Sequence, residues 1–311
     1  MTKTTEMLFT ECPICGSKED YKVIYKSNLD NVVIDSNIFS ARRLPDAVHY
    51  QIVRCKNDGL VRSNPVFKID GIEKLYKESK FTYFDQVKDL TVTYLNALNE
   101  VLPFLSRDDE ILEIGCGNGF LLQALLQKGF NNCYGIEPSL DAISKASEEV
   151  RRKINAGFLK EGTYKKGEFK LIYCFQTLDH IYDPADFLKM CFNLLSPGGF
   201  MLVFNHDVES LSSKIMRSKS PIIDIEHPFL YSKKTGRKLF VKFNFKVVKV
   251  YSPRNVISLG YLIWLLPLPK RIKVKLLGLK GILWDFILKQ KIILPLGNLC
   301  IIVAKPVNDP I

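Results

Sequence analysis

Residues 110–120, EILEIGCGNGF, decide the fold, because a short apolar run stops there at a turn with three glycines. The run is typical of a buried strand, and residues 121–126 continue directly as a helix. Glycines in such a turn let the main chain bend sharply and let a ligand approach the backbone. We therefore predict a strand–turn–helix unit whose turn binds a ligand.

Strands and helices alternate along the chain around this turn. Strands that alternate with helices indicate an α/β fold with a doubly wound, mostly parallel sheet. Ser139 is placed to cap one of the helices, and the sequence 197–199, PGG, is placed to stop another. The predicted strands are 110–114, 133–136, 170–175, 200–205, 245–251 and 298–304, and the predicted helices are 84–105, 121–126, 139–151 and 183–195.

The composition is that of an ordinary globular protein. The chain has 311 residues, of which 47% are hydrophobic and 25% are charged, and this excludes disordered and collagen-like chains. The longest uncharged apolar stretches, 255–269 and 292–304, are shorter than the ~20 residues of a spanning helix. The first residues lack the apolar core of a signal peptide, so we expect a cytoplasmic protein.

The glycine turn differs from the turn that binds dinucleotides. That turn would place its third glycine at position 120, which is Phe120. Here the spacing is E-x-G-x-G-x-G from Glu113 to Gly119, and the acid Glu137 ends the next strand. Glu137 can accept both hydroxyls of a ribose, Glu113 suits an amine, and the turn has no basic residue for a polyphosphate. These features together predict S-adenosylmethionine as the ligand.

The pattern resembles the class I S-adenosylmethionine-dependent methyltransferases over residues 84–251, including the segments 169–178 and 179–184. The resemblance implies a seven-stranded sheet, a turn that holds the methionine part of the cofactor, and an acid that holds its ribose. Two residues after the strand at 170–175 would line the same site. The expected cofactor residues are Glu113, Gly115, Cys116, Gly117, Asn118, Gly119, Glu137, Pro138, Gln176 and Thr177.

Three of the eight cysteines are clustered near the start of the chain. Cys12 and Cys15 have zinc-knuckle spacing, and Cys55 repeats it with Asp58 in place of a second cysteine. We predict a structural zinc ion on Cys12, Cys15, Cys55 and Asp58. His49 is the alternative fourth ligand, and a knuckle without metal is the other alternative.

A cysteine knuckle ahead of this fold resembles the sugar C-methyltransferases and related enzymes of surface-polysaccharide pathways. The resemblance implies a sugar or glycan acceptor, a lipid-linked one included, methylated at oxygen or carbon. The pair Glu226-His227, followed by Ser232, resembles the catalytic segment of those enzymes, in which a histidine takes the substrate proton.

Methyl transfer requires alignment of the acceptor and, for a hydroxyl or carbon nucleophile, a base. A histidine with a pKa near ~6.5 suits this task. We rank His227 first, His206 second and Asp207 third, with Glu226 as the partner of His227. The remaining candidate, His180, is expected to be structural.

The basic charge is concentrated in the last quarter of the chain. Of the net charge of +11, residues 241–311 contribute twelve basic against two acidic residues. Within them, a helical face of large apolar residues and both tryptophans predict a basic amphipathic helix, which suits a membrane surface. A cap over the substrate cleft is the alternative, and lysines among large aliphatics disfavour nucleic acid. The predicted face consists of Ile272, Leu276, Leu279, Leu283 and Phe286.

We therefore expect a knuckle segment at 1–66, a catalytic domain at 67–251, an insert at 252–297, and a last strand and tail at 298–311. The predicted function is methyl transfer from S-adenosylmethionine to a small-molecule or glycan acceptor. The rivals are a non-catalytic cofactor-binding or membrane-docking module and a nucleic-acid methyltransferase. Segment 256–291 is the candidate for peripheral contact with the inner face of a membrane.

Overall fold

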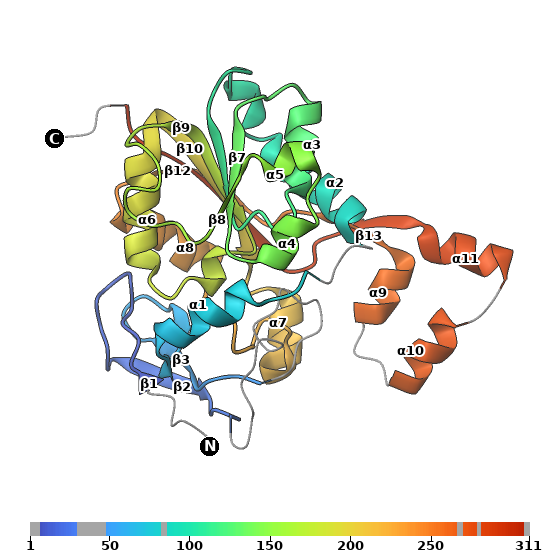
Figure 1. The fold of residues 1–311 in the computed structure, drawn as a ribbon. Helices are drawn as coiled ribbons and strands as arrows, with labels where there is room; N and C mark the ends of the chain where they lie inside the picture. Colours follow the sequence, from blue (N-terminus) through green and yellow to red (C-terminus); the bar gives the residue numbers. More distant parts are fainter. Residues whose placement is uncertain (1–6, 30–47, 82–85, 266–269, 279–280, 308–311) are drawn as a thin grey trace.

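Figure 1 shows the chain as a central sheet with helices on both faces, a smaller sheet beside it and a helical arm. The structure is a computed structural model, and it describes residues 7–29, 48–81, 86–265, 270–278 and 281–307. In the described part of the chain, no helix is long and apolar enough to cross a membrane.

The central sheet has seven strands in the order β12-β15-β10-β9-β6-β7-β8. The strands from β10 to β8 are parallel, and β15 runs antiparallel between β10 and β12. The predicted doubly wound, mostly parallel sheet is confirmed. Its strands are β6 (Ile111–Ile114), β7 (Cys133–Glu137), β8 (Ile154–Ala156), β9 (Phe169–Phe175), β10 (Leu195–His206), β12 (Lys246–Tyr251) and β15 (Asn298–Ala304).

Apolar side chains on both faces of this sheet form two cores. Tyr94 and Leu125 belong to the core beneath one set of helices, α2 (Val87–Leu98), α3 (Phe120–Gln127), α4 (Leu140–Ser144) and α5 (Glu148–Arg151). Phe187 and Phe240 belong to the core on the other face, beneath α6 (Pro184–Leu194) and α8 (Lys233–Lys242). Burial on both faces explains why the parallel strands are almost continuously apolar.

The helix predicted at 139–151 is wrong, because the chain forms the two short helices α4 and α5 there. Ser139 caps α4 by accepting the N–H of Ala142, as expected. Ser147 then caps α5 by accepting the N–H of Val150, which requires a non-helical residue between the two helices. Strand β8 follows and was not predicted, since only three residues form it and none is buried.

A second sheet joins the N-terminal segment to the rest of the chain. Its order is β11-β4-β3-β2, formed by β2 (Tyr21–Tyr25), β3 (Ile52–Cys55), β4 (Val61–Ser63) and β11 (Phe229–Leu230). Strand β11 therefore completes a sheet whose other strands precede it by more than 160 residues. The short strand β1 (Met7–Leu8) pairs with β5 (Val66–Phe67), and helix α1 (Ile69–Lys77) then follows along the chain toward the central sheet.

The insert before the last strand is an arm on a two-stranded base. β13 (Asn255–Ser258) pairs with β14 (Lys291–Leu294), and α9 (Leu259–Leu265), α10 (Lys270–Leu277) and α11 (Ile282–Lys289) lie between them. The single helical face predicted from Ile272 to Phe286 is wrong, because the helix breaks at the glycines between α10 and α11 and Gly281 has a φ of 152°. Leu279 of that face lies outside the described residues.

Candidate functional site

A cavity of about 1320 Å³ opens where the parallel strands end. The ends of β6, β7, β9 and β10 each bring a residue to its wall, namely Gly115, Glu137, Gln176 and His206. Ligands of open α/β sheets bind at this edge. The volume exceeds the roughly 300–1,000 Å³ of ordinary small-molecule pockets, so the cavity has room for a cofactor and a second molecule.

The turn after β6 forms one end of the cavity. Gly115, Gly117 and Gly119 have φ values of 76°, 55° and 69°. A Cβ on Gly115 would lie 2.5 Å from Thr177 Oγ1, and a Cβ on Gly119 would collide with Val150. Both the backbone conformation and the available space therefore require glycine at this turn, as the sequence predicted.

Glu137, at the end of β7, is buried beside this turn. Its Oε2 accepts the N–H of Gly117 at 2.8 Å, and its Oε1 accepts the N–H of Ser139 at 2.8 Å. Burial raises the pKa of Glu137, and these two hydrogen bonds oppose that shift. Each carboxylate oxygen keeps a second lone-pair site, so the side chain can still accept the hydroxyls of a ribose.

Glu113 is the second buried acid at this end. Its Oε2 accepts a hydrogen bond from the Tyr173 hydroxyl at 3.2 Å. Burial raises the pKa of Glu113 well above its usual value; the Tyr173 bond opposes this rise and the nearby Glu137 adds to it. A positively charged amine bound here would favour the ionised carboxylate. Glu113 is thus suited to a cationic part of a ligand.

Eight of the ten residues predicted to hold the cofactor line the cavity, Cys116 and Pro138 among them. The other two, Asn118 and Gly119, do not line it. Gly119 begins α3 and faces Val150 instead of the cavity.

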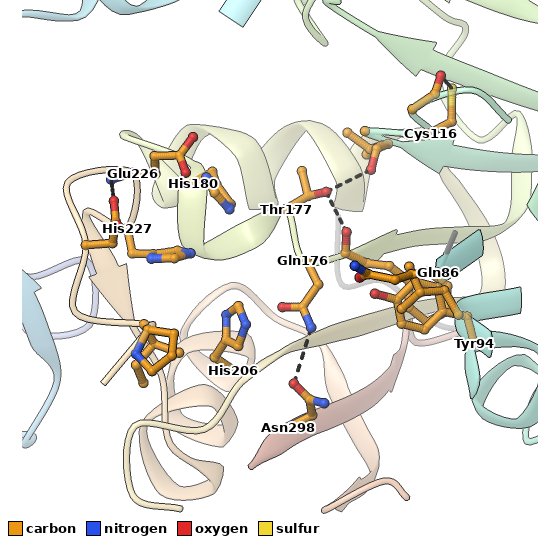
Figure 2. A pocket seen from close by; sticks show the side chains of 18 of the residues that line it. Gln86, Tyr94, Cys116, Gln176, Thr177, His180, His206, Glu226, His227 and Asn298 are labelled. Carbon is orange, nitrogen blue, oxygen red and sulfur yellow. Dashed lines mark hydrogen bonds between the residues drawn. The ribbon is translucent and has the colours of Figure 1, made fainter. Parts of the chain in front are cut away.

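Gln176 and Thr177 lie in the middle of the cavity, between its two ends (Figure 2). Gln176 has a φ of 51°, and its Nε2 donates to Asn298 Oδ1 at 3.2 Å. Asn298 in turn donates through Nδ2 to Asn255 Oδ1 at 2.9 Å. This amide chain connects the loop after β9 with the last strand and with the base of the insert.

Three histidines gather at the other end of the cavity, far from Cys116 (Figure 2). The ring of His227 lies 4.6 Å from that of His180 and 5.3 Å from that of His206, centroid to centroid. His206 Nδ1 lies 2.9 Å from Asp179 Oδ2, and His180 Nδ1 lies 3.0 Å from the Tyr76 hydroxyl. Ligand atoms of Asp179, His206 and His227 all lie within 4.8 Å of one another.

The charges at this end follow from burial and proximity. Burial alone would raise the pKa of Asp179, but the hydrogen bond with His206 and the neighbouring histidines lower it overall, so the carboxylate is ionised. An ionised carboxylate only accepts, so His206 Nδ1 donates this hydrogen bond, and in the neutral form of the ring Nε2 carries the lone pair. Burial lowers the pKa of His180 and, more strongly, that of His227, so both rings are neutral at pH 7.

Asp207, ranked third as a catalytic candidate, is not among the residues that line the cavity. Its Oδ1 accepts the N–H of Glu209 at 2.9 Å in the turn before α7 (Leu211–Met216). Successive strand residues point to opposite faces, so the chain that turns His206 into the cavity turns Asp207 away. Glu226 does line the cavity, beside His227.

Asp179, Asn298 and Tyr76 were missed in the sequence, and His180 was expected to be structural. Asp179 stands directly before His180 in the 3-10 helix η3 (Leu178–His180), so an acid–histidine pair after a parallel strand was the available signal. Tyr76 in α1 and Asn298 in β15 are brought in by tertiary structure alone.

The cysteine cluster lies in the second sheet and outside this cavity. Asp58 Oδ2 lies 3.1 Å from Cys12 Sγ and 3.3 Å from Cys55 Sγ, and Cys15 Sγ lies 3.5 Å from Cys55 Sγ. One ligand atom from each of these four residues lies within 4.8 Å of the others. Three thiols and a carboxylate at this spacing fit a four-coordinate zinc ion.

His49, the alternative fourth ligand, is not part of this cluster of described residues. Its Nδ1 lies 2.8 Å from the backbone oxygen of Tyr50, and its ring contacts Tyr25. The geometry therefore favours Asp58.

Replacing Glu137 by glutamine is expected to weaken binding of S-adenosylmethionine by about 10- to 100-fold, because a charge-assisted hydrogen bond is worth about 1.5–3 kcal/mol. Isothermal titration calorimetry measures this dissociation constant. Glu110→Gln is the matched control, since Glu110 precedes β6 at the opposite edge of the sheet and does not line the cavity. Equal affinities of the two variants would contradict the role of Glu137.

Lowering the pH from about 7 to about 5 is expected to lower the free energy of unfolding. The pKa values of His180 and His227 are lowered in the folded state, so the unfolded chain binds more protons below about pH 6.5. This contribution to stability is fully present above the unfolded pKa and is lost as the pH falls toward the folded values. Its slope is at most about 1.4 kcal/mol per pH unit for each histidine.

Urea denaturation at several pH values measures this dependence. The double variant His180→Gln, His227→Gln is expected to show a flatter dependence than the wild type. His49→Gln serves as the control, because its ring lies outside the cavity. A double variant as pH-sensitive as the wild type would show that other groups cause the effect.

Comparison with known proteins gives a family match over most of the central sheet. A family model described as a methyltransferase domain matches residues 87–250, which is more than half of the chain. One solved structure, a chain in the complex between the Haloferax volcanii Trm112 methyltransferase activator and a methyltransferase, superposes with a TM-score of 0.51. It has 15% identity and covers 76% of this chain and 95% of that one, so it supports the fold alone.

Similar curated proteins include two ubiquinone biosynthesis O-methyltransferases. The protein from Methylococcus capsulatus is 34% identical over 96 residues, which are 28% of this chain and 39% of that protein. The protein from Pseudomonas aeruginosa is 29% identical over 131 residues, which are 40% of this chain and 53% of that protein. The chain thus matches about half or less of the length of these relatives.

Proposed function

The chain belongs to the family of methyltransferase domains, and from this we propose that it transfers the methyl group of S-adenosylmethionine to a hydroxyl oxygen of a small acceptor. The observation that carries the proposal is a cavity with the glycine turn at one end and, at the other, His206, whose Nδ1 is hydrogen-bonded to Asp179. The first end suits the cofactor, and the second suits an acceptor that must lose a proton.

The residues at the glycine turn fit this cofactor. Gly115 and Gly117 line the cavity without side chains, so a ligand can lie against the backbone of the turn. Glu137 would accept the ribose hydroxyls and Glu113 would face the amine. When bound, S-adenosylmethionine supplies a methyl group on a positively charged sulfur.

The histidine end would activate the acceptor. His206 Nε2 would accept the proton of the acceptor hydroxyl as its oxygen takes up the methyl group. Asp179 fixes the tautomer of His206 through the 2.9 Å contact and stabilises the ring once it is protonated. His227 and Glu226, which line the cavity beside His206, would bind and orient the acceptor.

The acceptor atom in this proposal is oxygen. The similar curated proteins are O-methyltransferases, which favours oxygen over carbon and gives a sugar or glycan acceptor no support. The Glu226-His227 pair is compatible with a carbon acceptor too, because a histidine can also take a proton from carbon. The identity of the methylated atom in the product decides between the two.

The cysteine cluster is proposed to hold a structural zinc ion. Cys12 and Cys55 are buried and Asp58 bridges them, so a metal would supply the positive charge that these groups need as ligands. The four protein ligands fill a tetrahedral site and leave no open position for catalysis.

The function is tested by incubating the protein with methyl-labelled S-adenosylmethionine and fractionated cell extract. Label in a small molecule, absent with His206→Gln, is the expected result. Cofactor binding without label in any fraction would contradict the proposal and favour a non-catalytic module. Label that nucleases remove would instead identify a nucleic-acid methyltransferase.

A further inference from the structure

Helix α7 exposes large apolar side chains next to the cavity. Leu211 and Ile215, one helical turn apart, are 75% and 70% exposed. Ser213 and Met216 of the same helix line the cavity. The helix therefore presents one face to the cavity and an apolar face to the surroundings.

The arm of α9, α10 and α11 exposes apolar side chains as well. Val274 in α10 and Phe286 in α11 are both 63% exposed, and Ile293 in β14 is 60% exposed. Figure 1 shows that α10 and α11 stand away from the central sheet. A side chain such as Phe286 would have about 1.5–3 kcal/mol to gain from burial in an apolar phase.

The segments that carry these apolar side chains are rich in basic residues. Segment 252–297 carries eight lysines and arginines and a single acid, Asp285. Lys214 lies in α7, and Arg217 and Lys219 follow directly after it. Each basic residue near an anionic membrane surface contributes about 1 kcal/mol of attraction. Exposed apolar groups among cations are the pattern that binds the interface of an anionic bilayer.

The two surfaces belong to one rim of the cavity. The insert lines it with Gly260, Tyr261 and Lys273, and α7 lines it with the residues named above. The segment that follows the insert reaches the start of α7: Gly297 O accepts the N–H of Asp207 at 2.8 Å, and a Cβ on Gly297 would lie 2.7 Å from the Ser212 hydroxyl. The base of the arm is fixed to α2, where Lys291 contacts Asp89 at 2.7 Å and Val256 N–H donates to Thr93.

We propose that α7 and the arm dock the protein on an anionic lipid bilayer with the mouth of the cavity facing the lipid. A lipid surface is favoured over a nucleic acid because a bilayer can bury the exposed side chains of Leu211, Val274 and Phe286, whereas a phosphate backbone interacts only with the basic residues. In this orientation an amphiphilic molecule can enter the cavity directly from the bilayer.

Sedimentation with vesicles tests the proposal without any acceptor or turnover, so its outcome is independent of the proposed function. We expect binding to phosphatidylcholine vesicles that contain phosphatidylglycerol, weaker binding at high salt, and little binding to pure phosphatidylcholine. Binding to nucleic acid but not to anionic vesicles would overturn the proposal.

A charge-reversal variant locates the surface. Arg271→Glu, Lys275→Glu and Lys289→Glu together are expected to lower the partition coefficient on anionic vesicles at least tenfold. The matched control reverses Lys128, Lys166 and Lys242 to glutamate, which changes the net charge equally on exposed positions outside the cavity and the insert. Equal losses in both variants would show only general charge attraction and would overturn the assignment to this face.

Intrinsic fluorescence reports on the arm directly, because the only two tryptophans of the sequence, Trp264 and Trp284, lie in it. Anionic vesicles are expected to shift the emission to the blue, and lipids brominated on the acyl chain are expected to quench it. Phe286→Asp should reduce the quenching. Vesicle binding without a shift or quenching would mean that the arm stays in water, and would contradict the proposal.

Discussion

Replacing His206 by glutamine is expected to lower kcat for methyl transfer by about 10²- to 10⁴-fold, the usual contribution of a positioned general base. The dissociation constant for S-adenosylmethionine should change little, since His206 lies at the end of the cavity away from the glycine turn. Single-turnover measurements with saturating cofactor separate the two quantities.

Asp179→Asn is the companion variant. An amide can donate to His206 Nδ1 and so stabilise the wrong tautomer, which removes the lone pair from the side that faces the acceptor. We expect a loss comparable to that of His206→Gln, and a double variant no worse than either single one, because the two residues act as a unit.

The competing assignment is His227, which the sequence ranked first. Burial lowers its pKa strongly, which makes it a weak base. If His206→Gln kept more than about a tenth of the activity while His227→Gln lost it, the base would be His227. His49→Gln controls for general effects on the fold.

Replacing Cys15 by serine is expected to destabilise the protein by about 4 kcal/mol or more, together with loss of one zinc ion per chain. Cys15 is exposed, whereas Cys12 and Cys55 are buried. Without a metal, substitution of an exposed thiol is expected to change the free energy of unfolding by no more than about 0.5 kcal/mol. A large effect at this position therefore identifies a ligand and excludes simple packing.

Zinc content by mass spectrometry and urea denaturation before and after chelation measure both effects. Asp58→Asn is expected to lower zinc affinity while it preserves the size of the side chain. Glu19→Gln, an amide replacement at an exposed position outside the cysteine cluster, is the control. A metal-free protein as stable as the wild type would contradict the structural zinc site.

The sheet and its cofactor end could be predicted because their signals are local. The apolar run 111–114, the glycines and Glu137 all lie within one strand–helix–strand unit, where spacing along the chain determines position. The prediction of one helix at 139–151 was wrong for a local reason as well. Ser147 caps a second helix, and the spacing of apolar residues does not reveal such a cap.

The acceptor end could be predicted only in part, because distant segments form it. His206 and His227 were identified, but Asp179 was missed and Asp207 was chosen in its place. The sequence shows that Asp207 follows His206 directly. It does not show which acid lies on the same side of the sheet as the His206 ring, because that depends on how the neighbouring strands end. Tyr76 reaches His180 from α1, a contact that no spacing along the chain predicts.

The pairing of β11 with β4 has a consequence for the order in which the chain acquires its parts. The strands that carry the cofactor end, β6 to β9, are contiguous between residues 111 and 175. His227 precedes β11, and its backbone oxygen accepts the hydroxyl of Ser63, 164 residues earlier. Contacts this distant are slow to form because a long loop must close first. During synthesis, the chain would therefore be able to recognise its cofactor well before it could recognise an acceptor.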